Sequence, residues 1–248
     1  MKTLLAKHRS IRKFRSEPIA PEVLRECLEA ASRASTCGNM QLYSLIVTQS
    51  RELREALAPC HFNQPMVTQA PCVITVCADV HRFSMWCEQR DAEPCYDNFA
   101  WFLNGATDAL LAAQNLCVEA EAHGLGICYL GTTIYTAEEI ARILDLPKGV
   151  IPVTTIVVGH PDESPELTDR LPLDAVVHCE KYHHYTSSEI DELWAEKETS
   201  EETRRLLEEN GLPNLAQIFT RNRYRAEDNL AISRNYFALL KKQGFFNN

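Results

Sequence analysis

The sequence predicts a fold in which helices and buried strands share one core. Short apolar runs of strand length lie at residues 42–48, 72–78 and 152–159, and segments with apolar residues at helical spacing lie between them. With 248 residues, 45% of them hydrophobic, the chain can bury a substantial core. No run approaches the roughly 18–20 apolar residues of a membrane span. We therefore expect one domain over residues 1–248 that does not enter a membrane.

The charge of the chain limits its partners and its location. The net charge is −9 and the pI is about 5.4, whereas a protein that binds a nucleic acid needs a basic face. Lys7, His8 and Arg9 interrupt the first apolar residues, so the apolar core of a signal peptide is not expected. We expect a cytoplasmic protein with no nucleic-acid partner.

The ten cysteines predict neither a disulfide framework nor a metal site. No two of them form a CxxC pair, and several lie in apolar runs, as Cys72 and Cys77 do in PCVITVCAD. We expect mostly reduced, buried thiols. His178, His183 and His184 are alternative metal ligands, but no carboxylates converge on them in the sequence, so no metal is expected.

The first element is a basic run, HRSIRKF, at residues 8–14. Arg9 and Arg12 are three residues apart with Ser10 between them, and guanidinium and hydroxyl groups bind phosphate oxygens well. Ile11 and Phe14 alternate with the charges and are expected to anchor the run. The alternative is a solvated surface or targeting segment.

A helix, a polar loop and a strand follow. The helix begins near Pro21 and has an apolar face up to Ala31. The polar residues 34–41 come next, and the apolar run 42–48 predicts a strand. A polar loop between a buried helix and a buried strand is a common ligand site, and an ordinary cap and turn is about equally compatible with the pattern.

The middle of the chain predicts a short helix, a strand and a long helix. The short helix covers residues 51–58 and the strand residues 72–78, whereas residues 86–97 have no clear period. The long helix runs from Phe99 to about His123, with Asp97 or Asn98 as its cap. Because it is apolar around much of its circumference, we expect it to be central or to lie in a subunit interface.

The later segments predict further strands and a charged helical end. Glycines at residues 124–131 lead from helix to strand, which is not the order of a dinucleotide-binding fingerprint. We expect a helix at residues 138–144, and strands at residues 152–159 and 176–182. Beyond residue 187 the chain predicts charged helices, a break at residues 211–213, a basic cluster at residues 221–225, and a last helix at residues 226–242.

Together, these segments resemble the FMN-dependent nitroreductase family. The resemblance rests on the order and spacing of HRSIRKF, AST-x-x-N-x-Q, TDALLAAQN, AEAHGLG-x-CYLG, VVGHPDE and DRLP. It is greatest to the larger members, the oxygen-insensitive nitroreductases and NADPH–flavin oxidoreductases. It covers residues 7–182 well and the C-terminal segment loosely.

The resemblance implies both a fold and an activity. The fold is an α+β nitroreductase-like fold, with a central mixed, mostly antiparallel sheet flanked by helices. The protein would be an intertwined homodimer with FMN in two interface clefts and a helical extension, about residues 183–248, wrapped on the dimer. The activity is ping-pong hydride transfer from NADPH or NADH to FMN, and then to a nitroaromatic, quinone or flavin acceptor.

The resemblance also implies the site residues. One group holds the phosphate and ribityl end of FMN, Arg12 reaches the pyrimidine edge near N1 and O2, and other residues contact the ring. Gly38 and Arg234 lie on the substrate side, and no protein residue is expected to act as nucleophile or base. The cofactor-binding residues implied are His8, Arg9, Ser10, Arg12, Cys37, Asn39, Gln41, Gln69, Tyr129, Gly131, Thr132 and Arg170.

The chain departs from the family pattern in three places. Thr168 replaces a basic residue two positions before Arg170, and residues 131–135 read GTTIY instead of Gly-Gly-x-Arg-Asn. No clean counterpart exists of the basic loop that selects NADPH, although residues 204–205 or 221–225 are candidates. The alternative functions are a flavin-binding storage or redox-sensing protein with little turnover, and a structural dimer that has lost FMN.

Overall fold

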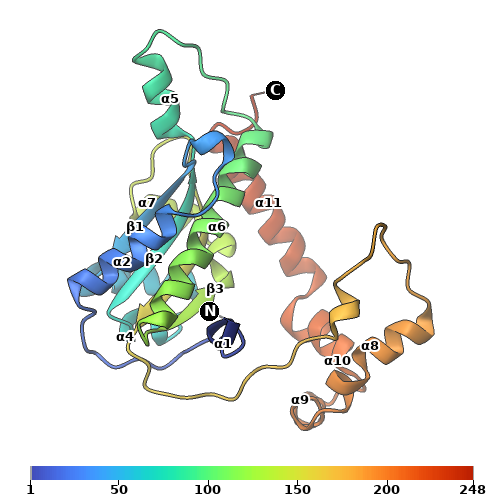
Figure 1. Ribbon diagram of the computed structural model, residues 1–248. Helices are drawn as coiled ribbons and strands as arrows, with labels where there is room; N and C mark the ends of the chain where they lie inside the picture. The colour runs from blue at the N-terminus through green and yellow to red at the C-terminus, as the bar shows by residue number, and fades with distance from the viewer. Residues whose placement is uncertain (1, 248) are drawn as a thin grey trace. The chain divides into compact units, whose positions relative to one another are not determined.

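The structure is a computed structural model that describes residues 2–247, in two compact units (Figure 1). The first unit extends to Glu166 and resumes at Ile232, and the second is Leu167–Ala231. The second unit begins before residue 183, where we expected the helical extension to begin. The assignment of one domain to residues 1–248 stays a prediction.

A four-stranded antiparallel sheet forms the centre of the first unit, in the order β1-β2-β4-β3. The strands are β1 (Tyr43–Thr48), β2 (Cys72–Asp79), β3 (Gly126–Leu130) and β4 (Val150–Gly159). All eight residues of β2 are buried, as expected of a continuous apolar run in a central strand. The strands expected at residues 42–48, 72–78 and 152–159 are confirmed.

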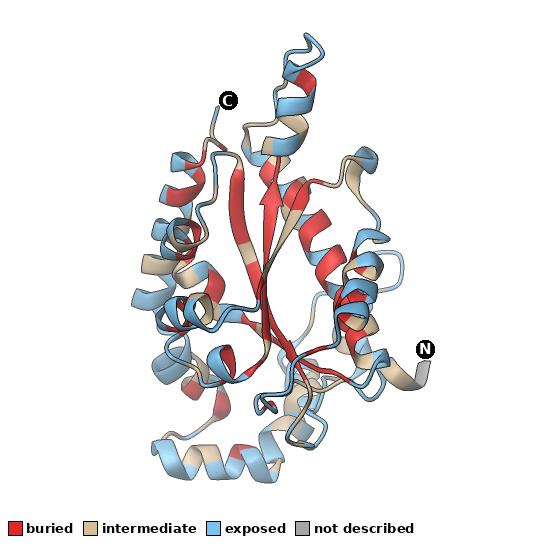
Figure 2. Ribbon diagram, turned by 90° about the vertical axis from the view of Figure 1, so that its left-hand side faces the viewer, coloured by how far each residue is buried: buried red, intermediate tan, exposed pale blue. Residues whose placement is uncertain are grey.

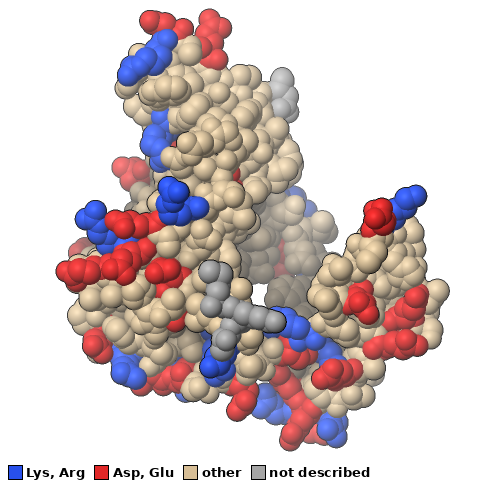
Figure 3. All heavy atoms as spheres, in the orientation of Figure 1, with Lys and Arg blue, Asp and Glu red and all other residues tan. Residues whose placement is uncertain are grey.

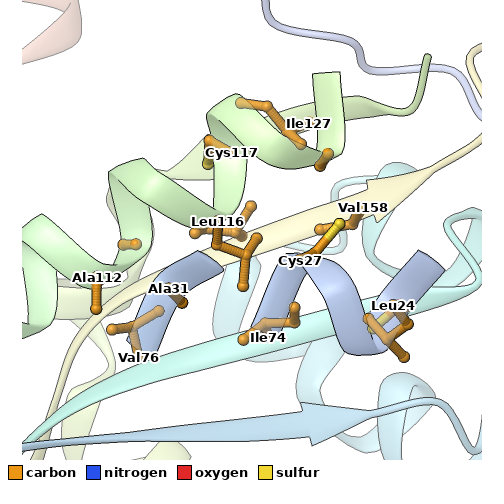
Figure 4. Close-up of a cluster of buried hydrophobic side chains, with 14 of the residues drawn as sticks. Leu24, Cys27, Ala31, Ile74, Val76, Ala112, Leu116, Cys117, Ile127 and Val158 are labelled. Atoms are coloured by element: carbon orange, nitrogen blue, oxygen red, sulfur yellow. The ribbon is translucent and has the colours of Figure 1, made fainter. Parts of the chain in front are cut away.

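One face of the sheet is covered by α2 (Pro21–Ser32) and α6 (Phe99–Ala122). Figure 4 shows side chains of both helices meeting those of the sheet. Asn98 caps α6, because its side chain accepts a hydrogen bond from the Trp101 amide. The long helix and its predicted cap are therefore confirmed.

The opposite face is covered by short elements. These are α3 (Arg51–Leu57), the 3₁₀ turn η2 (Ala58–His61), α4 (Met66–Gln69) and α7 (Ala137–Ile143). Figure 2 shows the buried strands between helices on both sides. The basic run contributes to this face through Ile11 and Phe14, each 6% exposed. The expected anchoring of the run is confirmed.

Two further 3₁₀ turns, η1 (Cys37–Asn39) and η3 (Gly131–Tyr135), begin segments that carry six of the fourteen predicted site residues. Helix α1 (Lys2–Leu5) precedes the basic run. Helix α5 (His81–Glu88) follows β2 and reaches into residues 86–97, where we expected no regular element. Its aromatic side chains explain its formation, because Phe83 packs on Trp86 and Tyr96 with ring centroids 5.3 and 5.2 Å apart.

The second unit is helical and contains η4 (Leu173–Ala175), α8 (Ser187–Thr199), α9 (Glu201–Asn210), α10 (Leu215–Gln217) and the π-helical turn η5 (Ile218–Arg223). Helix α11 (Ala226–Lys242) begins in it and continues in the first unit. The strand predicted at residues 176–182 is wrong. Val176 and Val177 are 67% and 51% exposed, and no strand pairs with them in the described part of the chain.

The cysteines and the surface agree with the expectations from composition. All ten cysteines are free, and seven of them are buried. Acidic and basic side chains are interspersed on the face drawn in Figure 3. None of the described helices has the length and apolarity needed to cross a membrane.

Candidate functional site

The basic run is fixed to the edge of the sheet by its main chain. Ser10 forms a parallel bridge with Ile127 of β3, and the Ile11 amide donates to the Ile127 carbonyl at 2.9 Å. Gly126 makes this approach possible, because a Cβ there would lie 2.7 Å from Ile11 Cγ1. The run therefore has a fixed backbone, from which its polar side chains project.

Some side chains of the run are bonded to other protein groups, and others are not. His8 Nδ1 lies 2.7 Å from Glu121 Oε1, and Arg9 Nη1 donates to the Pro165 carbonyl at 3.0 Å. Glu163 Oε1 accepts from the Arg12 amide at 2.5 Å. Within residues 2–247, the exposed Arg12 guanidinium has no hydrogen bond or ion pair. Arg12 and Lys13 are therefore the cations of the run whose side chains have no protein partner within the described residues, and Arg12 offers the planar, multi-donor group.

The turn η3 continues directly from β3, the strand with which the run pairs. A Cβ built on Gly131 meets no atom within 4 Å, so this stretch of main chain faces open space. Thr132 Oγ1 lies 2.8 Å from Nδ1 of the buried His61. The Tyr129 side chain packs into the core instead, where burial and the neighbouring Cys117 thiol raise the pKa of its hydroxyl. Gly131 and Thr132 are therefore better placed than the Tyr129 ring to meet a ligand.

The loop of residues 36–41 is organised by one buried carboxylate, Asp108 of α6. Asp108 is 2% exposed and accepts from Thr36 Oγ1 at 2.5 Å, from the Cys37 amide at 2.9 Å and from the Leu42 amide at 3.2 Å. The Thr36 hydroxyl in turn accepts from the Gln41 amide at 2.9 Å. This network leaves Gly38 and Asn39 exposed and Cys37 and Gln41 half-buried.

The predicted residues of this loop adopt unusual backbone conformations. Gly38, Asn39 and Gln41 have φ values of 55°, 57° and 48°, in the left-handed region. Gln41 Nε2 donates to Asn39 Oδ1 at 2.8 Å, and the Arg82 guanidinium donates to the carbonyls of Gln41 and Tyr43. The loop is thus held rigidly, as a preformed polar surface would be.

Sequence reasoning missed Asp108, Arg82 and His61. The only sequence signal for Asp108 is a charged residue in the otherwise apolar stretch DALLAA. A buried aspartate in an apolar helix needs donors, and the nearest candidates are polar main-chain groups of a loop.

The run and the loop lie at opposite ends of the sheet in one chain. The loop enters β1 at Tyr43, which aligns through Ala78 with Ile151 of β4. The run pairs at Ile127, which aligns with Val158 of β4. At about 3.3 Å per residue, these two positions of β4 are roughly 23 Å apart. The structure therefore places the run and the loop at opposite ends of the sheet, and η3, which follows Leu130 opposite Thr155, lies between them.

Three predicted residues lie outside both groups. Gln69 is exposed and lines a hollow of about 470 Å³ that also includes Ser16 and Arg54. Arg170 belongs to the second unit, where its guanidinium donates to Thr168 Oγ1 at 2.7 Å. Arg234 is an exposed residue of α11 in the first unit. Their proposed roles are untested by this arrangement.

Three of the five arginines suggested for nucleotide selection are engaged in local contacts. Arg205 pairs with Glu209 at 3.6 Å and Arg225 with Asp228 at 2.8 Å, both on exposed helix surfaces. The Arg223 guanidinium carbon lies 5.5 Å from the centroid of the Phe219 ring. These contacts are typical of solvated helix faces.

The histidines considered as metal ligands also have protein partners. His183 Nε2 lies 2.9 Å from Glu189 Oε1, and the His183 amide donates to His178 Nδ1 at 3.2 Å. In the first unit, His123 lies 3.0 Å from Glu26 and 3.3 Å from Glu119. This group joins α2 to the C-terminal end of α6 at the surface.

Comparisons with known proteins relate the chain to reductases. A sequence model of the nitroreductase family matches residues 5–101 and 58–160. An NADPH-dependent oxidoreductase from Staphylococcus aureus (strain USA300) is 36% identical over 184 residues, which is 73% of each chain. A crystal structure from Bacteroides fragilis NCTC 9343 is 48% identical, with a TM-score of 0.97 over 99% of this chain and 100% of that one. The NADPH:FMN oxidoreductase from Vibrio harveyi, solved in complex with NAD⁺, is 26% identical, with a TM-score of 0.83 over 100% of this chain and 99% of that one.

Proposed function

Because this chain belongs to the nitroreductase family, we propose that it is an FMN-dependent NAD(P)H oxidoreductase. The observation that carries this proposal is the free Arg12 guanidinium, which projects from a run whose main chain is fixed against β3. Bound FMN would supply the hydride-accepting and hydride-donating chemistry. The chain's own residues bind and orient it and adjust its affinity for electrons.

The residues of the run and of η3 fit FMN. Arg9 and Ser10 are the residues suited to the phosphate and ribityl end, because they offer charged and neutral donors next to each other. The main chain at Gly131 faces open space, so a flat ring can approach it closely. In this proposal His8 belongs to the same end of the cofactor, and Arg170 of the second unit adds a further phosphate contact.

Arg12 would act on the electronic state of the cofactor. Reduced flavin is negatively charged at N1 and O2, and a fixed cation beside these atoms stabilises that charge. Glu163 accepts hydrogen bonds from the Arg12 and Lys13 main chain, at 2.5 and 3.0 Å. These contacts orient the main chain of Arg12 without occupying its guanidinium. Hydride transfer from the nicotinamide to the flavin needs no proton, and the proton that the reduced acceptor takes up would come from water, so no protein residue is assigned as a general acid or base.

We propose that the protein acts as a homodimer. In one chain, the run and the loop of residues 36–41 are at opposite ends of the sheet. A second copy would place the Cys37, Asn39 and Gln41 loop of one chain beside the run of the other. Helix α6 carries exposed apolar residues suited to such an interface, namely Phe99, Leu103, Leu110 and Leu111.

We propose the chemical class of the electron donor and of the acceptor, not the individual compounds. NADPH or NADH is the donor, and the acceptor is a small planar oxidant such as a nitroaromatic, a quinone or a free flavin. In this arrangement Gly38 and Arg234 line the side from which donor and acceptor enter. Gln69 remains a proposed polar contact of the flavin, and the cytoplasm remains the proposed location.

Anaerobic stopped-flow spectroscopy of the purified, FMN-loaded protein tests the proposal. Flavin absorbance would be followed after mixing with NADPH and, separately, with NADH. Rapid bleaching is expected, and the ratio of the two rates would give the coenzyme preference. A protein that holds FMN stoichiometrically but is bleached by neither nucleotide would contradict the reductase activity and favour a flavin-storage or sensing role.

A further inference from the structure

The turn η2 is joined to the turn η3 by three consecutive residues. The Cys60 carbonyl accepts a hydrogen bond from Thr136 Oγ1 at 2.7 Å. His61 Nδ1 lies 2.8 Å from Thr132 Oγ1. The Phe62 ring packs on Tyr135 with the centroids 6.0 Å apart. Residues 60–62 therefore contact η3 at Thr132 and Tyr135 and also Thr136, the residue that follows it.

His61 is an unusual residue for this task. It is 0% exposed, and burial lowers its pKa from 6.5 to about 4, so the ring is neutral near pH 7. Its other ring nitrogen, Nε2, is buried and has no hydrogen-bond partner in the described structure. The Thr132 contact is thus the only polar contact of a fully buried imidazole.

The unpartnered Nε2 indicates which nitrogen carries the proton. A neutral imidazole has one N–H donor and one acceptor nitrogen. A buried N–H without a partner is rarer in proteins than an under-satisfied acceptor. The tautomer with the proton on Nδ1 is therefore favoured, and Nδ1–H donates to Thr132 Oγ1. The hydroxyl proton of Thr132 is then free to be donated elsewhere.

No described protein group accepts a hydrogen bond from the Thr132 hydroxyl. Thr132 is half-buried, and its hydroxyl has no partner other than His61 among the described residues. The neighbouring Gly131 faces open space, whereas the Thr133 hydroxyl points inward and donates to the Leu130 carbonyl at 2.9 Å. Thr132 and Thr133 are thus adjacent hydroxyls, and only the second is satisfied by the protein.

We propose that His61 is a positioning residue that fixes the Thr132 hydroxyl as a hydrogen-bond donor to the bound flavin. This inference rests on the proposed function, because it needs FMN beside η3. The donor would stabilise the electron-rich reduced ring more than the oxidised ring. The donor is thus the Thr132 side chain, which lies in the stretch GTTIY that departs from the family pattern, and His61 holds it in place.

The test is the midpoint potential of bound FMN in a set of matched variants. Thr132→Val removes the donor, and His61→Leu removes the residue that orients it. Both are expected to reduce the preference for reduced over oxidised FMN about tenfold, which is 29.6 mV for a two-electron couple. The double variant should show no further shift, because the two residues act through one hydroxyl.

Conservative variants separate positioning from general damage. Thr132→Ser keeps the hydroxyl, and His61→Asn places an amide N–H near the position of Nδ1, so both should retain most of the wild-type potential. Thr133→Val is the matched control, because it removes the adjacent hydroxyl that faces the protein. It should lower stability and leave the potential unchanged.

The outcomes distinguish this inference from the proposed function. If the wild-type protein did not bind FMN, the proposed function would fail and this inference with it. If the wild-type protein binds FMN and NAD(P)H bleaches it, but Thr132→Val leaves the potential unchanged, this inference alone is overturned. Long-range ¹H–¹⁵N spectra of the protein without FMN provide a second test, since a proton found on Nε2 of His61 near pH 7 would also overturn it.

Discussion

The basic run and the loop of residues 36–41 are held in place by opposite means. Shape holds the run: Ile11 and Phe14 are buried against the sheet, and Gly126 and Gly159 leave room for them. Polar groups hold the loop, chiefly the buried carboxylate of Asp108, with the Arg82 guanidinium bonded to the Gln41 and Tyr43 carbonyls. The run keeps the Arg12 and Lys13 side chains free at the surface, whereas the carboxylate of Asp108 is fully engaged in holding the loop.

This difference indicates what each segment tolerates. A segment fixed by packing is insensitive to the loss of its charges and sensitive to added volume. A segment fixed by a buried carboxylate is sensitive to the loss of that one group, because several main-chain donors would lose their only partner. The four predictions below test this contrast through the free energy of unfolding of the protein without FMN.

The largest effect is expected for Asp108→Ala. It would leave the buried Leu42 amide and the half-buried Cys37 amide without an acceptor, at a cost of about 3–5 kcal/mol. Urea unfolding would measure the loss. Asp108→Asn keeps the shape and one carbonyl oxygen and should lose clearly less. A loss below about 1 kcal/mol for Asp108→Ala would show that the loop does not depend on this carboxylate.

A smaller effect is expected for Gly126→Ala, which adds one methyl group where the run crosses β3. Its Cβ would lie 2.7 and 2.8 Å from side-chain atoms of Ile11, and such overpacking costs about 1–3 kcal/mol. Gly131→Ala is the matched control, because its Cβ meets open space and should change the free energy of unfolding by no more than about 0.5 kcal/mol. Equal losses in the two variants would contradict the role assigned to packing.

The sequence predicts local order better than it predicts these long-range contacts. The apolar runs of β2 and β4 and the apolar spacing of α6 were sufficient to predict these elements, because each pattern lies within one element. Asp108 and Thr36 are 72 residues apart, so no local pattern could pair them. The same reason explains why His61 was missed, since its partner Thr132 is 71 residues away.

The wrong strand at residues 176–182 has a related cause. Its valines suit a strand by propensity, but a strand needs a neighbour for its main-chain hydrogen bonds. The second unit offers helices instead, and Tyr185 donates to the Asp174 and Ala175 carbonyls, each at 3.2 Å. The helix α5 was missed for the converse reason, because contacts among aromatic side chains stabilise a segment without a clear period.

Glu163→Ala removes an exposed carboxylate acceptor, for comparison with the buried one that Asp108→Ala removes. Like Asp108, Glu163 accepts from two main-chain amides, those of Arg12 and Lys13, but these bonds are exposed. Water can replace the lost acceptor, so a loss of about 1 kcal/mol is expected, well below that of Asp108→Ala. The measurement is the ratio of the losses in free energy of unfolding of Glu163→Ala and Asp108→Ala, obtained by urea unfolding under the same conditions. Similar losses would show that burial does not separate the run from the loop.

The smallest effect on stability is expected for Arg12→Ala, because its guanidinium has no partner within residues 2–247. The free energy of unfolding should change by no more than about 0.5 kcal/mol. The affinity for FMN should nevertheless fall about tenfold or more, and flavin reduction should slow, because a charge-assisted contact to the reduced ring is lost. Fluorescence titration of the protein with FMN measures the first quantity and stopped-flow absorbance the second.

Arg15→Ala is the matched control for Arg12→Ala. Arg15 belongs to the same basic segment, but its side chain lies 4.0 Å from Asp162 and is 60% exposed. Its loss should leave both stability and FMN affinity nearly unchanged. If Arg12→Ala kept full FMN affinity and reduction rate, Arg12 would be a surface cation and not the residue that stabilises reduced flavin. If it lost stability instead, the run would depend on its charges, and the contrast between the run and the loop would be removed.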